Sequence, residues 1–462
     1  MFYDGESGDI VIALTGESLI TRKLSIFKED EFLKMVQMIR DADVSFTNAE
    51  CVFHDDEAPP WTVPGGQLGR GFYAPGTYMA SPSWCIKELQ WAGVKMVSTT
   101  NNHGSDFGEA GMLASIKHLD AYGMPHAGSG RNLREARSPA YLDTNKGRVA
   151  LIASAAWGPR LRGEVPWPEP WGIIAAEQSP HSPGRPGLNL IRQSVVFTVD
   201  REAFAALRRI SKELGHEAGA RERARREKPD VEPDLEKELY FQDTKFIPGE
   251  GFSMKSIADP VDLAENLKWV RDARRMADWV LYSYHDHGVC PSTEIPGDHH
   301  IEVAHGFIDN GGDVFIGHGP HQDRGIEIYK GKPIFHGLGD FILGNDTVQR
   351  MPHDNMLRAG LGWDTTPADF YDARAGKGWF NSVARWESMV AIVTFKAKKL
   401  KEIRLYPVDL GMGKPRGQAG RPMLTEPGSE VNSRVLKRLQ QMSEPYGTNI
   451  EIKDGVGVIS VG

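Results

Sequence analysis

The sequence has few cysteines and no long apolar run. Its three cysteines in 462 residues, Cys51, Cys85 and Cys290, are odd in number and far apart, so neither a disulfide framework nor a zinc-knuckle spacing is present. No run of about 18 apolar residues occurs, which excludes a membrane-spanning helix. The first residues also lack the basic and apolar stretches of a signal peptide. These absences predict a cytoplasmic protein with no membrane partner.

Basic residues do not outnumber acidic ones. The chain carries 54 Lys and Arg against 62 Asp and Glu, which gives a net charge of −8 and a pI near 6.0. Proteins that bind nucleic acids usually show a basic excess, so we expect no nucleic-acid partner and no polybasic membrane anchor. The 40% hydrophobic and 25% charged content is ordinary for a globular protein. No feature decides the oligomeric state, and a homo-oligomer remains open.

Short apolar runs rich in β-branched residues alternate with amphipathic segments. The runs predict strands at residues 9–16, 43–50, 94–101, 148–156, 277–285, 312–318 and 332–342. The amphipathic segments predict helices at residues 29–42, 106–123 and 259–277, the second of them opening with a capping box of Asp106 and Glu109. A β-hairpin is expected at 389–410 and a terminal helix at 435–447. This alternation predicts an α/β fold.

Two segments interrupt the alternation. Residues 157–193 are rich in Pro, Gly and Trp and predict a long ordered loop. Residues 216–238 are dense in charge and predict a solvated helix followed by a flexible linker. A clamp for an acidic substrate is the alternative for the charged segment, and the solvated helix is preferred.

Polar side chains follow most of the predicted strands at the point where each strand ends. In an α/β sheet, ligands bind beyond the carboxyl ends of the strands. A hydrophobic core does not accept several polar groups without partners, so core packing does not explain the whole set. The residues concerned are Glu17, Asn48, Glu50, Asn102, His103, His285, His287, His318, His321, His336 and Asp340.

This mixture of imidazole, amide and carboxylate groups indicates a metal site. Such ligands favour a site for manganese, zinc or iron that is not built from thiolates, and either one or two divalent ions fit. Glu50 is the candidate bridge between two ions. His103 is the candidate general acid, and Asp106 either holds its tautomer or only caps the following helix.

The stretch IGHGPHQ, residues 316–322, carries two of the candidate ligands, His318 and His321. Gly317 and Gly319 allow the backbone to turn closely, and Pro320 fixes φ just before the second imidazole. We expect at least one of the two histidines to bind metal, and His321 before His318.

Several stretches together resemble the CapA-type family, named for poly-γ-glutamate capsule biosynthesis and similar in fold to the calcineurin-like metallophosphoesterases. They are NAE, STTNNHGSDFGEAG, HAGSGRNLREARSP, YHDHG and IDNGGDVFIGHGPHQDRGIEIYKGKPIFHGLGDF. The resemblance implies two mixed β-sheets sandwiched by helices, with a metal site at strand ends. It implies metal ligands at Glu17, Glu50, Asn102, His285 or His287, His318 and His321. In it, Asn102 and His103 match an Asn-His pair of the family.

The resemblance also implies how the chain divides, and it is not complete. We expect a metallophosphatase-type domain at 1–345 with an insertion at 157–258, and a C-terminal extension at 346–462 that packs on the same domain. Glu17 stands where the family usually has Asp, and the closing Gly-Leu-Gly-Asp element ends on Asp340 in place of Asn. The phosphoesterases have His-x-His where this chain has His-Gly-Pro-His, so the metals or the substrate are expected to differ.

Three functions fit these residues. The first is a metal-dependent hydrolase that uses a metal-activated water to cleave an amide, γ-glutamyl-like or ester bond of a small organic or polymer substrate. The second is a phosphoesterase, and the third is a non-catalytic accessory factor in poly-γ-glutamate capsule biosynthesis. Arg22 and Arg324 are the candidate phosphate clamps, and Trp157, Trp167 or Trp171 could close over an organic substrate. The full set of candidate substrate-binding residues is Arg22, Asn48, Trp157, Arg324 and Asp340.

Overall fold

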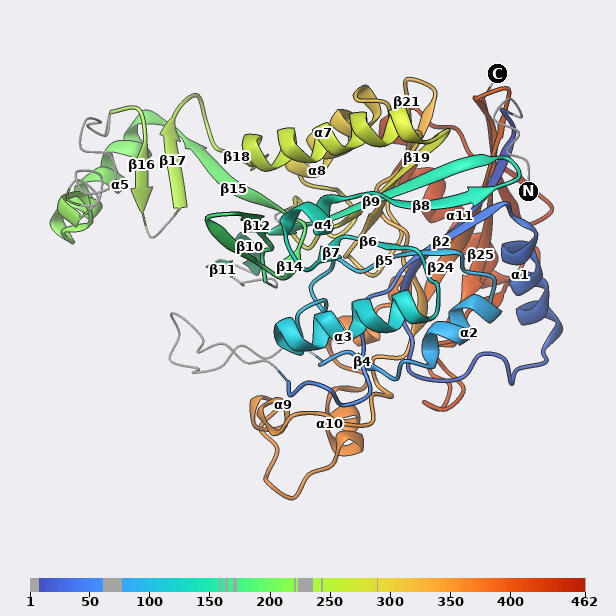
Figure 1. The fold of residues 1–462 in the computed structure, drawn as a ribbon. Coiled ribbons are helices and arrows are strands. Elements are labelled where there is room, and N and C mark those ends of the chain that lie inside the picture. The colour runs from blue at the N-terminus through green and yellow to red at the C-terminus, as the bar shows by residue number, and fades with distance from the viewer. Residues whose placement is uncertain are drawn as a thin grey trace.

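Two mixed β-sheets pack face to face, and helices cover the outer face of each (Figure 1). The computed structural model describes residues 8–60, 77–157, 159–162, 165–168, 173–219, 222, 236–241, 244–288 and 290–461. Within this part of the chain the layers run helix, sheet, sheet, helix, which confirms the predicted two-sheet α/β sandwich.

The first sheet is built around the N-terminal strand. Its order is β27 (Glu451–Lys453), β28 (Val456–Ser460), β25 (Lys399–Asp409), β24 (Glu387–Lys396), β1 (Ile10–Leu19), β2 (Val44–Asn48), β5 (Met96–Ser98) and β6 (His126–Ala127). Two further strands join it, β23 (Asp340–Leu343) beside β1 and β26 (Met423–Leu424) beside β25. Strands from both ends of the chain therefore meet at β1.

The second sheet comes from the middle of the chain. Its order is β16 (Leu239–Phe241), β17 (Thr244–Pro248), β15 (Leu190–Val199), β9 (Gly147–Trp157), β19 (Trp279–His285), β20 (Val314–His318), β22 (Lys332–Phe335) and β21 (Ile326–Tyr329). Strand β18 (Ser253–Ala258) pairs with β15, and β8 (Ala140–Thr144) pairs with β9. In Figure 1 the far part of β15 and strands β16 and β17 extend away from the body, beside helix α5 (Arg201–Glu213).

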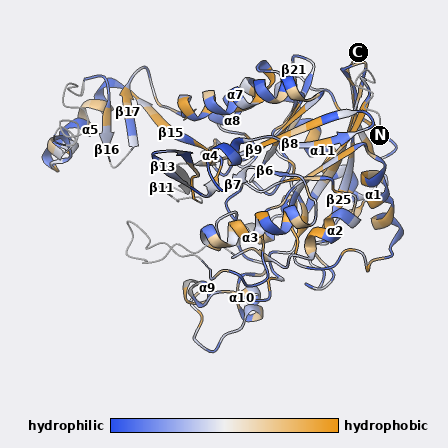
Figure 2. Ribbon diagram, viewed as in Figure 1, coloured by the Kyte–Doolittle hydropathy of each residue, from blue (hydrophilic) through white to orange (hydrophobic). Residues whose placement is uncertain are grey.

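The helices fall into two groups by the sheet that they cover. Those on the first sheet include α1 (Asp30–Asp41) and α2 (Cys85–Trp91), whereas α7 (Pro260–Met276) and α8 (Asp298–Asp309) cover the second. The remaining helices are α3 (Gly108–Ala121), α4 (Leu133–Arg137), α9 (His353–Arg358), α10 (Pro367–Arg374) and α11 (Glu430–Ser443). Strands in the centre of the molecule are mostly hydrophobic, while helices such as α7 mix both kinds of residue (Figure 2).

Alternation along the strands explains why the two sheets face each other. In β1, Ile12 and Leu14 belong to the core between the sheets, and Ala13 belongs to the core under the helices. In β19, Leu281 belongs to the core between the sheets, and Tyr282 packs toward α7 and α8. Successive strand residues point to opposite faces, so a strand that is apolar at every position must be covered on both sides.

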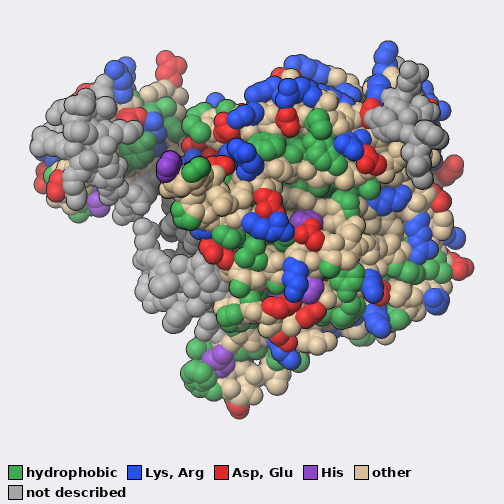
Figure 3. Space-filling view, viewed as in Figure 1, with side chains coloured by type: hydrophobic (Ala, Val, Ile, Leu, Met, Phe, Trp, Pro, Cys, Tyr) green, Lys and Arg blue, Asp and Glu red, His purple; other side chains and the backbone are tan. Residues whose placement is uncertain are grey.

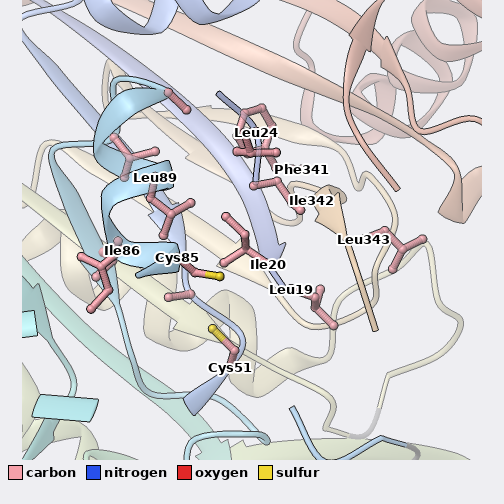
Figure 4. Packing of buried hydrophobic residues seen from close by; sticks show 14 of the residues in the cluster. Leu19, Ile20, Leu24, Cys51, Cys85, Ile86, Leu89, Phe341, Ile342 and Leu343 are labelled. Atoms are coloured by element: carbon pink, nitrogen blue, oxygen red, sulfur yellow. The ribbon is translucent and has the colours of Figure 1, made fainter. Parts of the chain in front are cut away.

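Two of the three cysteines pack in the hydrophobic core between the first sheet and the helices that cover it. Figure 4 shows Cys51 and Cys85 among Ile20, Leu89 and Phe341. Both thiols are free and buried. Cys51 directly follows Glu50 but packs as a small apolar side chain, which agrees with a site made of oxygen and nitrogen ligands.

The C-terminal part of the chain completes the first sheet. Strand β24 pairs antiparallel with β1, from Ile10 opposite Phe395 to Leu14 opposite Ala391, and β25 continues the predicted hairpin. Helix α11 adds Val435 to the core between the sheets. The residues after 345 therefore share one sheet and one core with the first strand.

Residues 157–193 are not the long loop that their composition predicts. They contain β10 (Pro159–Arg162), β11 (Val165–Pro168), β12 (Ala176–Ser179), β13 (Ser182–Arg185), β14 (Gly187–Leu188) and the start of β15. Strands β10 and β11 form one antiparallel pair, and β12 and β13 form another. Every strand of such a pair is an edge, where proline is tolerated. Most of the charged segment 216–238 lies outside the described residues.

Two further predictions are wrong in detail. The single strand expected at 332–342 is two strands, because β22 lies in the second sheet and β23 in the first. The capping box at Asp106 is absent: α3 begins after Phe107 with no side-chain cap, and the Asp106 carboxylate accepts a hydrogen bond from Met79 N instead.

The described part of the chain has no helix that could span a membrane, and its charges in view are of both signs (Figure 3). No helix in the described ranges is long and apolar enough to cross a bilayer. On the face drawn in Figure 3, Lys and Arg side chains are mixed with Asp and Glu side chains.

Close contact between two glycines joins β1 to the turn before β23. A Cβ added at Gly16 would lie 1.6 Å from the carbonyl oxygen of Gly339, which also accepts a hydrogen bond from Glu17 N. We expect Gly16→Ala to lower the free energy of unfolding by about 2 to 3 kcal/mol, because the backbone must separate to admit the methyl group. Urea unfolding measures the loss. Gly219→Ala is the control, since no atom lies within 4 Å of its added Cβ, and an equal loss there would contradict the explanation.

Candidate metal centre

Strand ends from both sheets meet at one place: the carboxyl ends of β2, β19 and β20, the last part of β1 and the first residue of β23. In the first sheet, Glu17 of β1 is paired with Asn48 of β2 and with Asp340 of β23. In the second sheet, His285 of β19 is paired with His318 of β20. Because the two sheets face each other, these ends bring polar side chains together in an otherwise apolar interior.

Three carboxylates and one imidazole form the first candidate metal group. Glu17, Glu50, His321 and Asp340 each place a ligand atom within 4.8 Å of the others, and all four are buried. His321 Nδ1 lies 2.8 Å from both Glu17 Oε2 and Asp340 Oδ1, and its Nε2 lies 3.6 Å from Glu50 Oε1. Asp340, expected to bind substrate, therefore lies among the candidate ligands.

The second group shares Glu50 with the first. Glu50, His285 and His287 place ligand atoms within 4.8 Å of one another. His285 Nδ1 lies 3.1 Å from Glu17 Oε1, which leaves its buried Nε2 without a hydrogen bond in the described structure. Asn102 Oδ1 is also buried without a partner there, and Asn102 lines one pocket with His285 and His287.

The surroundings of Glu50 indicate whether a cation fits at this site. It is fully buried, yet neither of its carboxylate oxygens accepts a hydrogen bond from the described residues. Burial, reinforced by the charge of Glu17, raises the pKa of Glu50 well above its usual value. A buried carboxylate without donors is costly unless it is protonated or binds a cation. The residues fit a divalent metal, and because Glu50 belongs to both groups they fit two ions with Glu50 between them.

The charges around His321 show how strongly this site attracts a cation. Burial disfavours a charged imidazole, but Glu50, Glu17 and Asp340 outweigh it and raise the pKa of His321 to about 10. Burial also disfavours the Glu17 carboxylate, but the charge of His321 and hydrogen bonds from His285 and His321 hold its pKa well below the usual value. The three carboxylates thus require positive charge beside them.

The backbone of the GHGPH stretch is shaped as the glycines predict. A Cβ at Gly317 would lie 2.5 Å from the His336 carbonyl oxygen, and one at Gly319 would lie 2.3 Å from that of Asp286. His321 has a φ of 55°, which is rare for a residue with a side chain and is often found at functional sites. This conformation directs its ring to the carboxylates.

His318 is placed differently from His321. Its ring packs 5.6 Å from that of Phe46, and burial lowers its pKa to about 3. Neither ring nitrogen has a hydrogen-bond partner in the described structure, and His318 is outside both metal groups. His321 is therefore the better placed of the two candidates.

His103 and Asp106 form a pair beside Glu50. His103 Nδ1 lies 2.6 Å from Asp106 Oδ2, and His103 Nε2 lies 3.8 Å from Glu50 Oε1. The same Asp106 oxygen accepts the hydrogen bond from Met79 N at 2.8 Å. Asp106 therefore orients the imidazole, the first of the two roles expected for it.

Of the other candidate substrate-binding residues, Asn48 contacts the second group, whereas the two arginines bond elsewhere. Asn48 is enclosed, with its amide 3.2 Å from His285 Nδ1 and its oxygen bonded to Ser98 Oγ at 2.8 Å. Arg22 donates to the carbonyls of Gly417 and Ala419. Arg324 donates to the carbonyl of Thr293. The side chain of Trp157 and residue Trp171 lie outside the described part of the structure, as does the side chain of Trp167.

Comparison with known proteins identifies the family. A family model described as "Bacterial capsule synthesis protein PGA_cap" matches residues 7–345. The chain belongs to this family. Every candidate ligand of the two metal groups lies within the matched residues.

Named relatives of this capsule synthesis family member differ in how much of the chain they cover. An uncharacterized protein, y4sH of Sinorhizobium fredii, is 31% identical over 96% of this chain and 91% of its own length. The PGA biosynthesis protein CapA of Bacillus subtilis is 27% identical over 28% of this chain and 35% of its own length. A probable polyglutamine synthesis accessory protein of Mycobacterium tuberculosis is 26% identical over 52% of this chain and 43% of its own length.

The sequence prediction did not include a set of residues that supports the candidate ligands from the outer side of the second sheet. Asp286 lies between His285 and His287, and its Oδ2 is 3.0 Å from His299 Nε2 and 3.1 Å from His300 Nδ1 at the start of α8. Its other oxygen accepts from the N–H of Gly288. The pair of adjacent histidines in GDHH, just ahead of an amphipathic segment, was the available signal. This contact fixes the loop that carries two candidate ligands.

Arg385 was missed for a different reason. It is 2% exposed, and its Nε lies 3.9 Å from Asp340 Oδ2. Burial lowers the pKa of Arg385 to about 10 against the effect of the nearby carboxylates. It follows residue 345 in a stretch without a motif, so no sequence pattern connects it to the site.

Removing the shared carboxylate should separate metal binding from folding. We expect manganese or zinc at 100 times its dissociation constant to stabilise the native protein by about 2.7 kcal/mol, seen as a rise in Tm. Glu50→Gln should abolish most of that rise. Without metal, the same variant should be at least as stable as the native protein, because a buried repulsion with Glu17 is removed.

The control is a carboxylate of a more exposed group. Asp55, Glu57 and His118 also place ligand atoms within 4.8 Å, but both acids are exposed. Glu57→Gln should keep the full metal-induced rise in Tm. A rise that survives in Glu50→Gln and vanishes in Glu57→Gln would move the metal to the surface group.

Proposed function

We propose that the protein is a metal-dependent hydrolase that cleaves an amide, γ-glutamyl-like or ester bond of a small organic or polymer substrate. The observation that carries the proposal is Glu50, a buried carboxylate shared by two ligand groups, with the imidazole of His103 beside it. A scaffold protein gains nothing from burying Glu50 in this way, because its carboxylate loses hydration and accepts no hydrogen bond from the described residues.

The ligands divide between two positions. Glu17, Glu50, Asp340 and His321 would hold one divalent ion, and Glu50, His285, His287 and Asn102 would hold the other. When bound, such ions lower the pKa of a water and polarise the substrate oxygen. The pocket lined by Asn102, His285 and His287 lies beside the second position, and a substrate would approach the ligands there.

His103 would move the proton that hydrolysis requires. The contact between its Nδ1 and the Asp106 carboxylate keeps Nε2 turned toward Glu50. From Nε2 the imidazole would donate a proton to the leaving nitrogen or oxygen as the bond breaks. Asp106 is buried and bonded to Met79 N, so it holds the ring in place throughout.

The hydrolase is favoured over a phosphoesterase. Of the two arginines expected to clamp phosphate, Arg22 donates to the carbonyls of Gly417 and Ala419, and Arg324 Nε donates to that of Thr293. Neither arginine has a hydrogen bond to a residue of the two ligand groups in the described structure. A phosphate ester needs donors beside the metals that remain available to its oxygens.

A non-catalytic role in capsule polymer synthesis is the second candidate. The observation that favours it is the name of the relative in M. tuberculosis, a probable polyglutamine synthesis accessory protein. The two candidates differ in what they require of His103, because an accessory factor has no use for a general acid.

Replacing His103 tests the hydrolase directly. With manganese or zinc bound, we expect His103→Ala to lower kcat by 10²- to 10⁴-fold on γ-glutamyl p-nitroanilide while the metal content stays the same. Asp106→Asn should lower kcat less, because the imidazole stays but its orientation loosens. Matched assays with p-nitrophenyl phosphate separate the phosphoesterase alternative.

The control is His118→Ala, since His118 pairs with exposed Glu57 away from the two groups. It should leave kcat unchanged. If His103→Ala loses metal together with activity, His103 is a ligand and not the acid. If native protein with bound metal hydrolyses none of these substrates, the accessory role is favoured.

A further inference from the structure

The pocket beside the second ligand group has a wall that the proposed hydrolysis does not use. Its described lining includes no lysine and no arginine. Its apolar lining is formed by Ala155 and Ala156 of β9 and Leu190 of β15. The polar side chain of Gln193 lies beside this apolar surface. A ligand in the pocket therefore meets imidazoles, the carboxamides of Asn101, Asn102 and Gln193, and aliphatic carbon.

Gln193 lies at the point in β15 where the strand changes its pairing partner. Residues Leu190–Arg192 pair with β9, and from Gln193 onward the strand pairs with β18, beginning with Ala258. A Cβ placed at Gly288 would lie 2.2 Å from Gln193 Nε2, so the carboxamide packs directly on the backbone that follows His287. A glycine at 288 is what lets the carboxamide lie this close to the candidate ligands.

The carboxamide of Gln193 lacks the partner that its burial calls for. The residue is 8% exposed, and its Oε1 accepts no hydrogen bond from the described residues. An unsatisfied buried polar group costs about 1 to 3 kcal/mol and is rare in folded proteins. Asn102 Oδ1 shares this property but already has a role as a candidate metal ligand. Gln193 has no such role in the chain itself, which leaves the ligand of the pocket as its partner.

The chemistry of a carboxamide selects its partner. Its unsatisfied Oε1 is an acceptor, so it needs a donor, and the N–H of a secondary amide is such a donor without charge. A phosphate or carboxylate only accepts hydrogen bonds, so it would leave Oε1 unsatisfied and would find no lysine or arginine in the described lining to balance its charge. The small side chains of Ala155 and Ala156 leave room for aliphatic carbons beside the amide.

We propose that Gln193 is a specificity-determining residue that pairs with a neutral secondary amide next to the bond being cleaved, so that the substrate is peptide-like. This inference rests on the proposed hydrolase function for the position of the scissile bond. It adds the class of group that must stand beside that bond.

A matched pair of substrates tests the pairing. One is N-acetyl-dialanine p-nitroanilide, and the other is its depsipeptide analogue, in which an ester oxygen replaces the N–H next to the scissile bond. We expect the metal-loaded native protein to prefer the amide by about 10- to 100-fold in kcat/KM, because the ester leaves Oε1 unsatisfied. Gln193→Leu should bring the ratio close to 1, with its metal content unchanged.

The control is Gln178→Leu, on the exposed strand β12, which should keep the native preference. A preference that survives in Gln193→Leu overturns the inference while leaving the hydrolase intact. If native protein cleaves neither substrate, the proposed function fails, and calorimetric binding of N-acetyl-dialanine amide and its depsipeptide analogue decides the inference alone. Tighter binding of the amide that Gln193→Leu removes supports the pairing, and equal binding of the two compounds rejects it.

Discussion

The burial of three carboxylates at one point is the constraint on which the rest of this structure depends. Glu17, Glu50 and Asp340 are each fully shielded from solvent, and their charges raise the pKa of His321 to about 10 when no metal is bound. Each carboxylate loses hydration worth several kcal/mol, which only nearby positive charge offsets. Arg385 supplies part of that charge, and either a proton on His321 or a divalent cation bound to its neutral ring would supply the rest. The fold therefore brings the three carboxylates together although their negative charges repel one another.

Close backbone contacts make this meeting possible. Gly16 touches the Gly339 carbonyl, and Gly319 touches that of Asp286. Each contact joins two segments that carry candidate ligands. The glycines contribute by letting these segments approach closely, because they have no side chain to keep them apart. On the outer side of the second sheet, His299 and His300 of α8 contact the carboxylate of Asp286. The ligands thus stand on rigid strand ends supported by a further layer of hydrogen bonds, as precise sites require.

Much of this arrangement could be predicted from sequence, and the failures have physical causes. Apolar runs that end in polar residues were enough to predict an α/β fold and a cluster at the strand ends containing Glu50 and His321, and the family resemblance implied the two-sheet sandwich. Asp106 looked like a helix cap because its spacing to Glu109 is that of a cap, but tertiary contacts with His103 and Met79 took its carboxylate. Arg385 could not be predicted, because its place beside Asp340 depends on a long-range fold and no local pattern records it.

The pairing of β1 with β24 has a consequence for how the protein is made. The N-terminal strand is translated first, but its antiparallel partner is completed only near residue 396, and Arg385 lies just ahead of that partner. Contacts over such a separation form late, because a long loop must close before they contribute. A ribosome must therefore release most of the chain before the first sheet can close. Assembly of the ligand cluster therefore comes late, because Glu17 meets Asp340 and the charge of Arg385 only after most of the polypeptide has been made.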